Sequence, residues 1–469
     1  MKQDLLGAMR EGRALSLRQQ IRLVAQLSVP AILAQVSSII MQYIDTSMVG
    51  SLGTNASAAI GLVASTTWLL GGLCRAMIVG FCVQTAQRIG AGDEQDARNL
   101  VRQGIVTGLA FGLLLAGLGA AVSGALPRWL GADSAIWKDA AAYFLVYSLA
   151  LPFFLLNRLA AGLLQASGNM RTPSILLVLM CPLDVVFNFF LIFPTRQIGG
   201  ITVPGAGLGV TGAALGTALA EAVVALLLCA ALLLYSPMLH LRRGERLRFV
   251  PRQLKRAALL AAPVALEQAV MSGGQVATTS IIAPLGTTSI AANSFAVTAE
   301  ALCYMPGYGV QNAAITLVGQ SVGAERRDLV TRLSWVTVLL GTGVMGAAAG
   351  LMYVLAPTII GILTPDALAA ALAVQVLRIV VFAEPLYGAS IVATGVFQGA
   401  GNSLLSSVLN FVSMWGVRVP LTVLLANSMA LPGAWIAMSI ELAVRGLLFL
   451  IVLAKKWWLP RSFREKTKQ

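Results

Sequence analysis

The sequence contains few charged residues for its length. Only 11% of its 469 residues are Asp, Glu, Lys or Arg, against about 25% in soluble domains, and 57% are hydrophobic. The sequence has no HExxH motif, which argues against a metalloprotease, and a single histidine, His240, which argues against a Ser/His hydrolase. It also has no nucleotide-binding loop, which argues against an ATP-driven pump. The five cysteines lie in apolar stretches without metal-ligand spacing. We therefore expect neither an enzyme nor a cofactor, and no catalytic residues.

The sequence contains long apolar segments. The length of each is close to the ~20 residues that a helix needs to cross a bilayer. The first six runs are residues 24–49, 58–86, 103–126, 140–166, 173–194 and 206–237. The second six are 257–283, 289–318, 333–357, 369–396, 403–427 and 431–454. The sequence therefore predicts an all-α polytopic membrane protein with twelve transmembrane helices.

The net charge of +14 is distributed unevenly along the chain. Basic residues are concentrated near the N-terminus, in every second loop and in the tail, whereas loops 50–57, 284–288 and 428–432 carry no charge. This positive-inside pattern predicts an integral inner-membrane protein with both termini in the cytoplasm. Anionic lipid headgroups suit these basic loops better than nucleic acid does. The polar N-terminus shows no cleavable signal peptide.

The second half of the chain repeats the first at an offset of 233. Pro30 corresponds to Pro263, and Pro152 to Pro385. Leu52-Gly53-Thr54 corresponds to Leu285-Gly286-Thr287. With six helices in each half, these are parallel repeats, which are typical of transporters. We expect a cytoplasmic segment (1–23), a first lobe (24–237), a linker (238–256), a second lobe (257–454) and a basic tail (455–469). Prolines within the spans should bend their helices. Because these prolines are largely paired across the repeat, we favour static architecture over hinge bending during alternating access.

Several segments resemble the MATE family, the multidrug and toxic compound extrusion transporters. They are SVPAILAQ (28–35), IDTSMVGSLGT (44–54), GLLQASGNMRTP (162–173), GVTGAALGTALAEAV (209–223), AEALCYMPGYGVQNAAITLVGQSVGA (299–324) and GVFQGAGN (395–402). The resemblance implies a secondary active exporter that exchanges organic cations or amphipathic drugs for H⁺ or Na⁺ by alternating access. We expect a monomer.

Acidic residues inside the spans are candidate functional groups, because a charge at the bilayer centre costs at least ~2.5 kcal/mol on insertion scales. Asp45 lies late in the first span, and the family resemblance implies a coupling aspartate there. Asp184 and Asn188 share one helix face at i, i+4 spacing, in the reverse of the family's usual order. The resemblance adds Thr217. These four residues would supply oxygen ligands for Na⁺ or a proton relay.

In the second lobe the candidates are Glu267 and Glu300. Neither is repeated in the first half, where Ala34 and Thr67 correspond to them. A charge present in only one copy of a duplicated scaffold indicates function, so we expect these two carboxyl groups to attract a cationic substrate or to form a second proton site. Glu384, Arg378 and Arg418 remain ambiguous, as do the partners of Arg75 and Arg158, whereas Glu441 and Arg445 read as a structural pair.

Aromatic and sulfur side chains could line a cavity for many substrates through cation–π contacts and adaptable surfaces. The candidates are Tyr43, Trp68, Phe295, Tyr304, Met305, Tyr308 and Trp415. For any one of these residues, however, lipid-facing or core packing is the favoured interpretation. At the level of function, the alternatives are a flippase for lipid-linked oligosaccharide or lipid, which shares the broader fold, and a channel. A flippase for a pyrophosphate-linked substrate would need a cationic cavity, whereas the best-placed charges here are acidic.

Overall fold

The computed structural model describes residues 5–10, 13, 15–198, 201–242, 245, 248–460 and 463, and these residues are overwhelmingly helical. The elements of the first half are α1 (Leu5–Arg10), α2 (Leu17–Gly50), α3 (Thr54–Gly90), α4 (Glu94–Val122), α5 (Leu126–Trp129), α6 (Trp137–Ala166), α7 (Arg171–Ile192), β1 (Pro194–Ile198), β2 (Ile201–Ala206), α8 (Gly209–Ala230) and the π-helix η1 (Ala231–Tyr235).

The second half continues with α9 (Pro251–Ile282), the 3₁₀-helix η2 (Ala283–Leu285), α10 (Thr287–Gly323), α11 (Arg327–Leu363), α12 (Ala367–Val380), α13 (Glu384–Gly399), α14 (Ser403–Ser413), the π-helix η3 (Met414–Arg418) and α15 (Val419–Ala454). Each of the twelve predicted spans falls largely within one or more of these helices, which confirms the predicted helical fold class.

Nine helices of the described chain are long and apolar enough to cross a membrane, or ten if the bent pair α12–α13 counts as one span. Residues Ser403–Ala454 make up one of these nine helices, although they contain two predicted spans. Ala430 (φ 53°, ψ −139°) interrupts α15 between the two spans. Pro432 follows this break, and proline cannot extend the hydrogen-bond ladder of a helix. α10 is not in the count.

Two predicted regions differ in detail from the structure. The predicted span 369–396 is two helices that meet at 61°, with Pro385 in the first turn of the second helix. Because the residue before proline disfavours α geometry, a break at this point has a local cause. Residues 195–205, expected to be a loop, include an antiparallel pair of strands, β1 and β2. Arg196 of β1 lies over the rings of Phe189 and Phe193.

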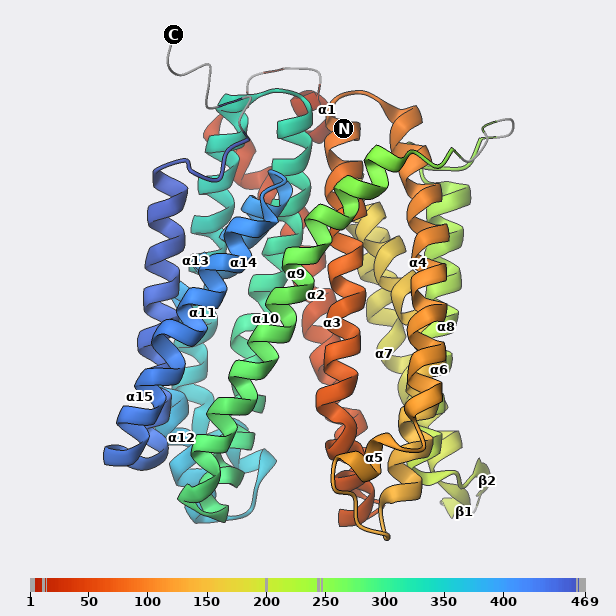
Figure 1. The fold of residues 1–469 in the computed structure, drawn as a ribbon, viewed down its shortest axis with the longest axis vertical. Coiled ribbons are helices and arrows are strands. Elements are labelled where there is room, and N and C mark those ends of the chain that lie inside the picture. The colour runs from red at the N-terminus through yellow and green to blue at the C-terminus, as the bar shows by residue number, and fades with distance from the viewer. Residues whose placement is uncertain are drawn as a thin grey trace. The chain divides into compact units, whose positions relative to one another are not determined.

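Packing within the chain defines two compact units. Unit 1 comprises residues 1–36, 86–92 and 259–469, and unit 2 comprises 37–85 and 93–258. Within unit 2, α6 contacts α4 and α8, and α8 contacts α7 (Figure 1). Glycines permit these close approaches: a Cβ on Gly112 would lie 2.9 Å from the Cα of Pro152. Small residues at helix contacts are the usual solution in membranes.

Unit 1 is built around α10, which packs against α11, α12 and α13. α13 in turn contacts α15, and a buried apolar core fills the spaces between these helices. α1 lies at the same end of this unit as the C-terminal end of α15 (Figure 1).

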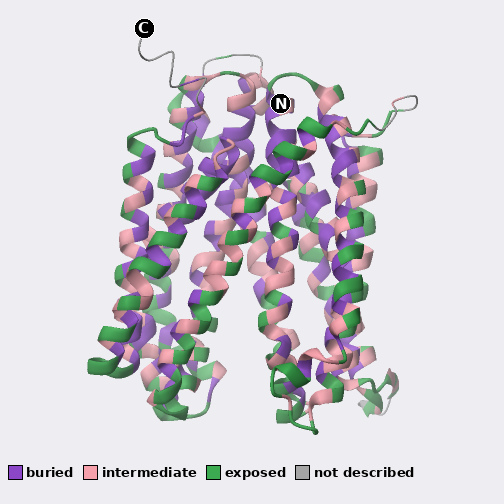
Figure 2. Ribbon diagram, viewed as in Figure 1, coloured by how far each residue is buried: buried purple, intermediate pink, exposed green. Residues whose placement is uncertain are grey.

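Exposed residues occur along the whole length of the helices (Figure 2), and many of them are large and apolar. On α4 these include Leu113, Leu114 and Leu118, each 57% exposed, and on α8 Leu226 is 65% exposed. Soluble proteins rarely expose extended apolar patches of this kind. Together with the spans, this surface is that of an integral membrane protein.

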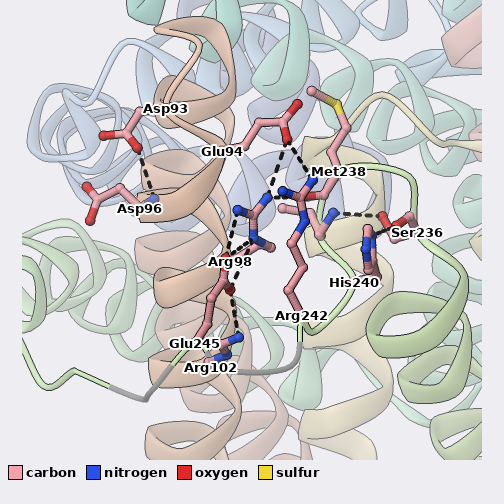
Figure 3. Close-up of polar contacts among 11 residues, drawn as sticks. Asp93, Glu94, Asp96, Arg98, Arg102, Ser236, Met238, His240, Arg242 and Glu245 are labelled. Carbon is pink, nitrogen blue, oxygen red and sulfur yellow. Dashed lines mark hydrogen bonds and ion pairs between the residues drawn. The ribbon is translucent and has the colours of Figure 1, made fainter.

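The linker is attached to α4 by a network of charges that we call the linker clasp: Glu94, Arg98, Arg102, Arg242 and Glu245 (Figure 3). Arg98 Nη2 lies 2.8 Å from Glu245 Oε1, and Arg102 Nη2 lies 2.7 Å from Glu245 Oε2. Hydrogen bonds from Arg98 and its positive charge lower the pKa of Glu245 below its ordinary value. The clasp therefore fixes the linker to unit 2 while Glu245 is ionised.

Candidate functional site

Three helices of unit 2 bring together a buried polar cluster, which we call the Asp45 cluster: Asp45, Asp184, Asn188 and Thr217. Asp184 and Asn188 are fully buried and lie one turn apart on α7, as their spacing predicted. Asn188 Nδ2 donates to Asp45 Oδ1 of α2 at 2.9 Å and to Asp184 Oδ2 at 2.9 Å. One neutral amide therefore bridges two carboxyl groups.

A glycine on α8 makes room for this amide. A Cβ added at Gly216 would overlap with the Oδ1 atom of Asn188 and would lie 3.0 Å from its backbone nitrogen. Real Cβ atoms are not found so close to other heavy atoms. The position of the Asn188 side chain therefore depends on the absence of a side chain at position 216.

Thr217 follows Gly216 and completes the cluster. Its hydroxyl lies beside the carboxyl group of Asp184 and also bonds to the carbonyl oxygen of Ala213 in its own helix, at 3.2 Å. The structure thus places all four predicted first-lobe residues in one location. The reversed order of Asp184 and Asn188 does not prevent this convergence, because Asn188 reaches both acidic groups.

The cluster has unused hydrogen-bonding capacity. Oδ1 of Asp184 and Oδ1 of Asn188 are buried, and neither has a hydrogen-bond partner within the described part of the chain. Buried acceptors of this kind are costly unless they receive a proton or bind a cation. Among the described residues no group of three or more His, Cys, Asp or Glu is placed to hold a metal ion. A bound Na⁺ would therefore need amide or hydroxyl oxygens in addition to the two carboxyl groups.

In unit 1 the two predicted glutamates belong to separate sites. Glu267 on α9 is half-buried and accepts hydrogen bonds from Ser407 Oγ at 2.7 Å and Asn410 Nδ2 at 2.6 Å, both on α14. Glu300 on α10 is buried and lies beside the fully buried Glu384 of α13. The sequence left the role of Glu384 ambiguous, yet its side chain interacts with that of Glu300.

Basic residues balance part of this acidic charge. Arg418 of η3 interacts electrostatically with Glu300 and Glu441. Arg445 Nη2 lies 2.6 Å from Glu441 Oε1, which also accepts a hydrogen bond of 2.5 Å from Ser413 Oγ. The predicted i, i+4 pair on the last helix is therefore present and buried.

The predicted cavity-lining residues occupy varied surroundings. Tyr304 makes edge contacts with Tyr308 and Tyr387, with ring centroids 6.1 and 6.0 Å apart, so part of the set forms an aromatic cluster. Phe295 packs against the core of unit 1. Trp68 is 66% exposed. Tyr43 and Met305 are half-buried. Trp415 is 39% exposed, and its Nε1 donates a hydrogen bond of 3.1 Å to the carbonyl oxygen of Val270.

Sequence reasoning missed one buried carboxyl group in unit 2. Glu221 on α8 is 2% exposed and accepts a hydrogen bond from Asn157 Nδ2 of α6. An available indication was that Glu221 is the only Asp, Glu, Lys or Arg in the predicted span 206–237, the same criterion that singled out Asp45.

Comparison with known proteins identifies the family. The MatE family model matches residues 30–190 and again 263–424, once in each half of the repeat. The chain belongs to the MatE family. It is accordingly a membrane transporter and not an enzyme, and the duplicated match confirms the two-lobed repeat.

Individual relatives match over nearly the whole chain. It is 25% identical over 454 residues to the probable multidrug resistance protein NorM of Thermotoga maritima, covering 95% of each chain. It is 28% identical to the probable NorM of Pseudomonas aeruginosa, covering 96% of this chain and 91% of that protein.

Solved MATE structures share the fold. One is described as the outward-facing conformation of a multidrug resistance MATE family transporter of the MOP superfamily, with a TM-score of 0.87, 20% identity and coverage of 93% and 96%. A mutant of the Vibrio cholerae MATE transporter VcmN gives a TM-score of 0.86 at 18% identity, with coverage of 94% and 97%.

Proposed function

We propose that this MatE-family protein is a secondary active multidrug exporter that antiports organic cations or amphipathic drugs against H⁺ or Na⁺. The observation that carries the proposal is the double hydrogen bond from Asn188 to Asp45 and Asp184. The relatives named as multidrug resistance proteins support the class of substrate.

The Asp45 cluster suits reversible cation binding. Two carboxyl groups share a neutral donor, so their negative charge is not cancelled by that partner. Ionising both groups away from water is unfavourable, and uptake of H⁺ or Na⁺ relieves the repulsion. Because Asp45 is on α2 and Asp184 is on α7, cation binding would change how strongly these two helices attract each other.

Energy for export would come from the coupling ion. Moving one charge through the membrane potential is worth about 2.3 kcal/mol per 100 mV. In alternating access, ion binding from outside displaces the drug, and ion release inside restores a substrate-ready lobe.

Unit 1 supplies candidate groups for the substrate. Glu267 and the Glu300–Glu384 pair carry acidic groups suited to an organic cation, and the cluster of Tyr304, Tyr308 and Tyr387 offers aromatic faces. The exporter is proposed to reside in the inner membrane as a monomer, with both termini in the cytoplasm and its basic loops against anionic headgroups.

Purified protein in liposomes tests this proposal. Ethidium transport is measured under an imposed pH gradient and, separately, an imposed Na⁺ gradient. The variants are Asp45→Asn and the control Asp133→Asn, which changes an exposed loop carboxylate. We expect one gradient to drive transport by wild type and Asp133→Asn but not by Asp45→Asn. If neither gradient moves ethidium through the wild type, the proposal is wrong, and flipping of a fluorescent lipid is the next assay.

A further inference from the structure

A second buried acidic site lies in unit 2, outside the Asp45 cluster. Glu221 of α8 and Asn157 of α6 form a hydrogen bond in which the Asn157 amide donates to Glu221 Oε2. Asn157 is fully buried and Glu221 is 2% exposed. The same amide lies 3.6 Å from the Met180 sulfur of α7, so this site sits where three helices meet.

The hydrogen-bond donor to Glu221 is the neutral amide of Asn157. Because this donor carries no charge, other groups nearby decide whether Glu221 is protonated. A buried carboxylate with only an amide donor is expensive, whereas a protonated carboxyl group needs no counter-charge. Arg158, next to Asn157 on α6, interacts electrostatically with Glu221, as does Asp184 of α7. Tyr147 of α6 also interacts electrostatically with Glu221.

Asn157 has spare capacity in the same location. Its Oδ1 atom is buried and has no hydrogen-bond partner within the described ranges. A protonated Glu221 could donate to this oxygen after a small rotation of the amide, whereas an ionised Glu221 accepts from its nitrogen. The Asn157 amide can therefore serve both protonation states, and a purely apolar neighbour could serve neither.

The site continues the line of polar groups that begins at the Asp45 cluster. Thr217 and Glu221 are four residues apart on α8, and Asp184 and Asn188 are four residues apart on α7. Four residues of a helix rise about 6 Å. Because α7 leads into β1 and α8 follows β2, Asp184 and Glu221 are the members of these two pairs that lie farther from the β1–β2 end of unit 2.

We propose that Glu221 is a second proton-binding site of unit 2, one turn of α8 beyond Thr217 of the Asp45 cluster. This inference rests on the proposed antiport and makes H⁺ the ion that this lobe handles.

Proton binding is measured without transport, so a failed antiport assay does not decide the result. Full-length protein in lipid nanodiscs is titrated while infrared difference spectra record the carbonyl band of protonated carboxyl groups. The variants are Glu221→Gln, Asp45→Asn and their combination. Each substitution should remove a separate carboxyl component, and Glu221→Gln should bind one proton fewer than wild type. If Glu221→Gln titrates as wild type does, the proposal is overturned.

Arg158→Gln provides a second, independent test if Glu221→Gln does not fold. Arg158 is exposed, so its replacement should be tolerated. Losing this cation should change the pH at which the Glu221 component titrates while leaving the Asp45 component in place. No movement would overturn the assignment.

Discussion

Asn188 on α7 donates a hydrogen bond of 2.9 Å to Asp45 on α2, across 143 residues of sequence. The same nitrogen also donates to Asp184, one turn away on its own helix. The Asn188 amide therefore links α2 and α7. Each of its two hydrogen bonds is stronger when the accepting carboxyl group is ionised than when it is protonated. The first two predictions follow from it.

Replacing the bridging amide should uncouple the cluster. We expect Asn188→Leu, which is similar in size and lacks both amide atoms, to reduce gradient-driven ethidium transport about 10- to 100-fold. A hydrogen bond to a charged group is worth about 1.5–3 kcal/mol, which corresponds to that range. The control is Asn427→Leu at an exposed position of α15. Equal transport by the two variants would remove Asn188 from the coupling site.

Filling the space beside Asn188 should have a similar effect without changing any polar atom. In Gly216→Ala the new methyl group collides with Asn188 Oδ1 and forces the amide away from Asp45. We expect at least a tenfold loss of transport with the protein still inserted and folded. Gly117→Ala on α4 is the matched control, because a Cβ there meets nothing within 4 Å. Normal transport by Gly216→Ala would mean that the amide position is not critical.

The sequence predicted the Asp45 cluster because each of its acidic members stands out in an apolar span. Asp45 and Asp184 are costly residues at membrane depth, and the i, i+4 spacing placed Asn188 on the same face as Asp184. Their contact with Asp45 depends on how α2, α7 and α8 pack against one another, and the sequence did not predict that packing. The role of Gly216 was equally hidden, because a helix glycine has many uses and only the packing shows which atom it accommodates.

The second lobe shows the limit of residue-by-residue prediction. Glu267 and Glu300 were chosen by the same criterion, yet Glu267 bonds to α14 and Glu300 lies beside Glu384. Interhelical partners depend on rotation and tilt, which spans of uniform hydrophobicity do not encode. The α12–α13 break was foreseeable in part, since Pro385 marks it, but the bend of 61° was not.

Glu267 should contribute to recognition of positively charged substrates. Its carboxylate is held by Ser407 and Asn410, both neutral donors, so its charge remains available to a ligand. We expect Glu267→Gln to raise the KM for ethidium several-fold while a neutral substrate is affected less. Ser407→Ala, which removes one of the two donors, should have a smaller effect. The measurement is initial transport rate against substrate concentration, and equal effects on charged and neutral substrates would contradict this role.

The linker clasp should make stability dependent on pH. Because the folded pKa of Glu245 is lowered, its contribution is fully present above the unfolded value of about 4.3 and is lost as the pH falls through the folded pKa. We expect Glu245→Gln to cost about 1–2 kcal/mol at pH 7 and less at pH 3. Thermal unfolding of detergent-solubilised wild type and variant at both pH values measures this. A difference that is the same at both pH values would contradict an ionic clasp.

Removing one member of the Glu441–Arg445 pair should destabilise the protein mainly because the other charge stays buried without its partner. The attraction within the pair should contribute less to stability. Arg445→Met leaves the buried Glu441 carboxylate with Ser413 as a hydrogen-bond donor, and breaking a buried pair from one side typically costs about 3–5 kcal/mol. The double variant Glu441→Gln/Arg445→Met removes both charges and keeps the Ser413 contact, so it should be more stable than Arg445→Met alone. Thermal unfolding ranks the variants. If the double variant is the less stable one, Arg418, which also attracts Glu441, must already neutralise that carboxylate when Arg445 is absent.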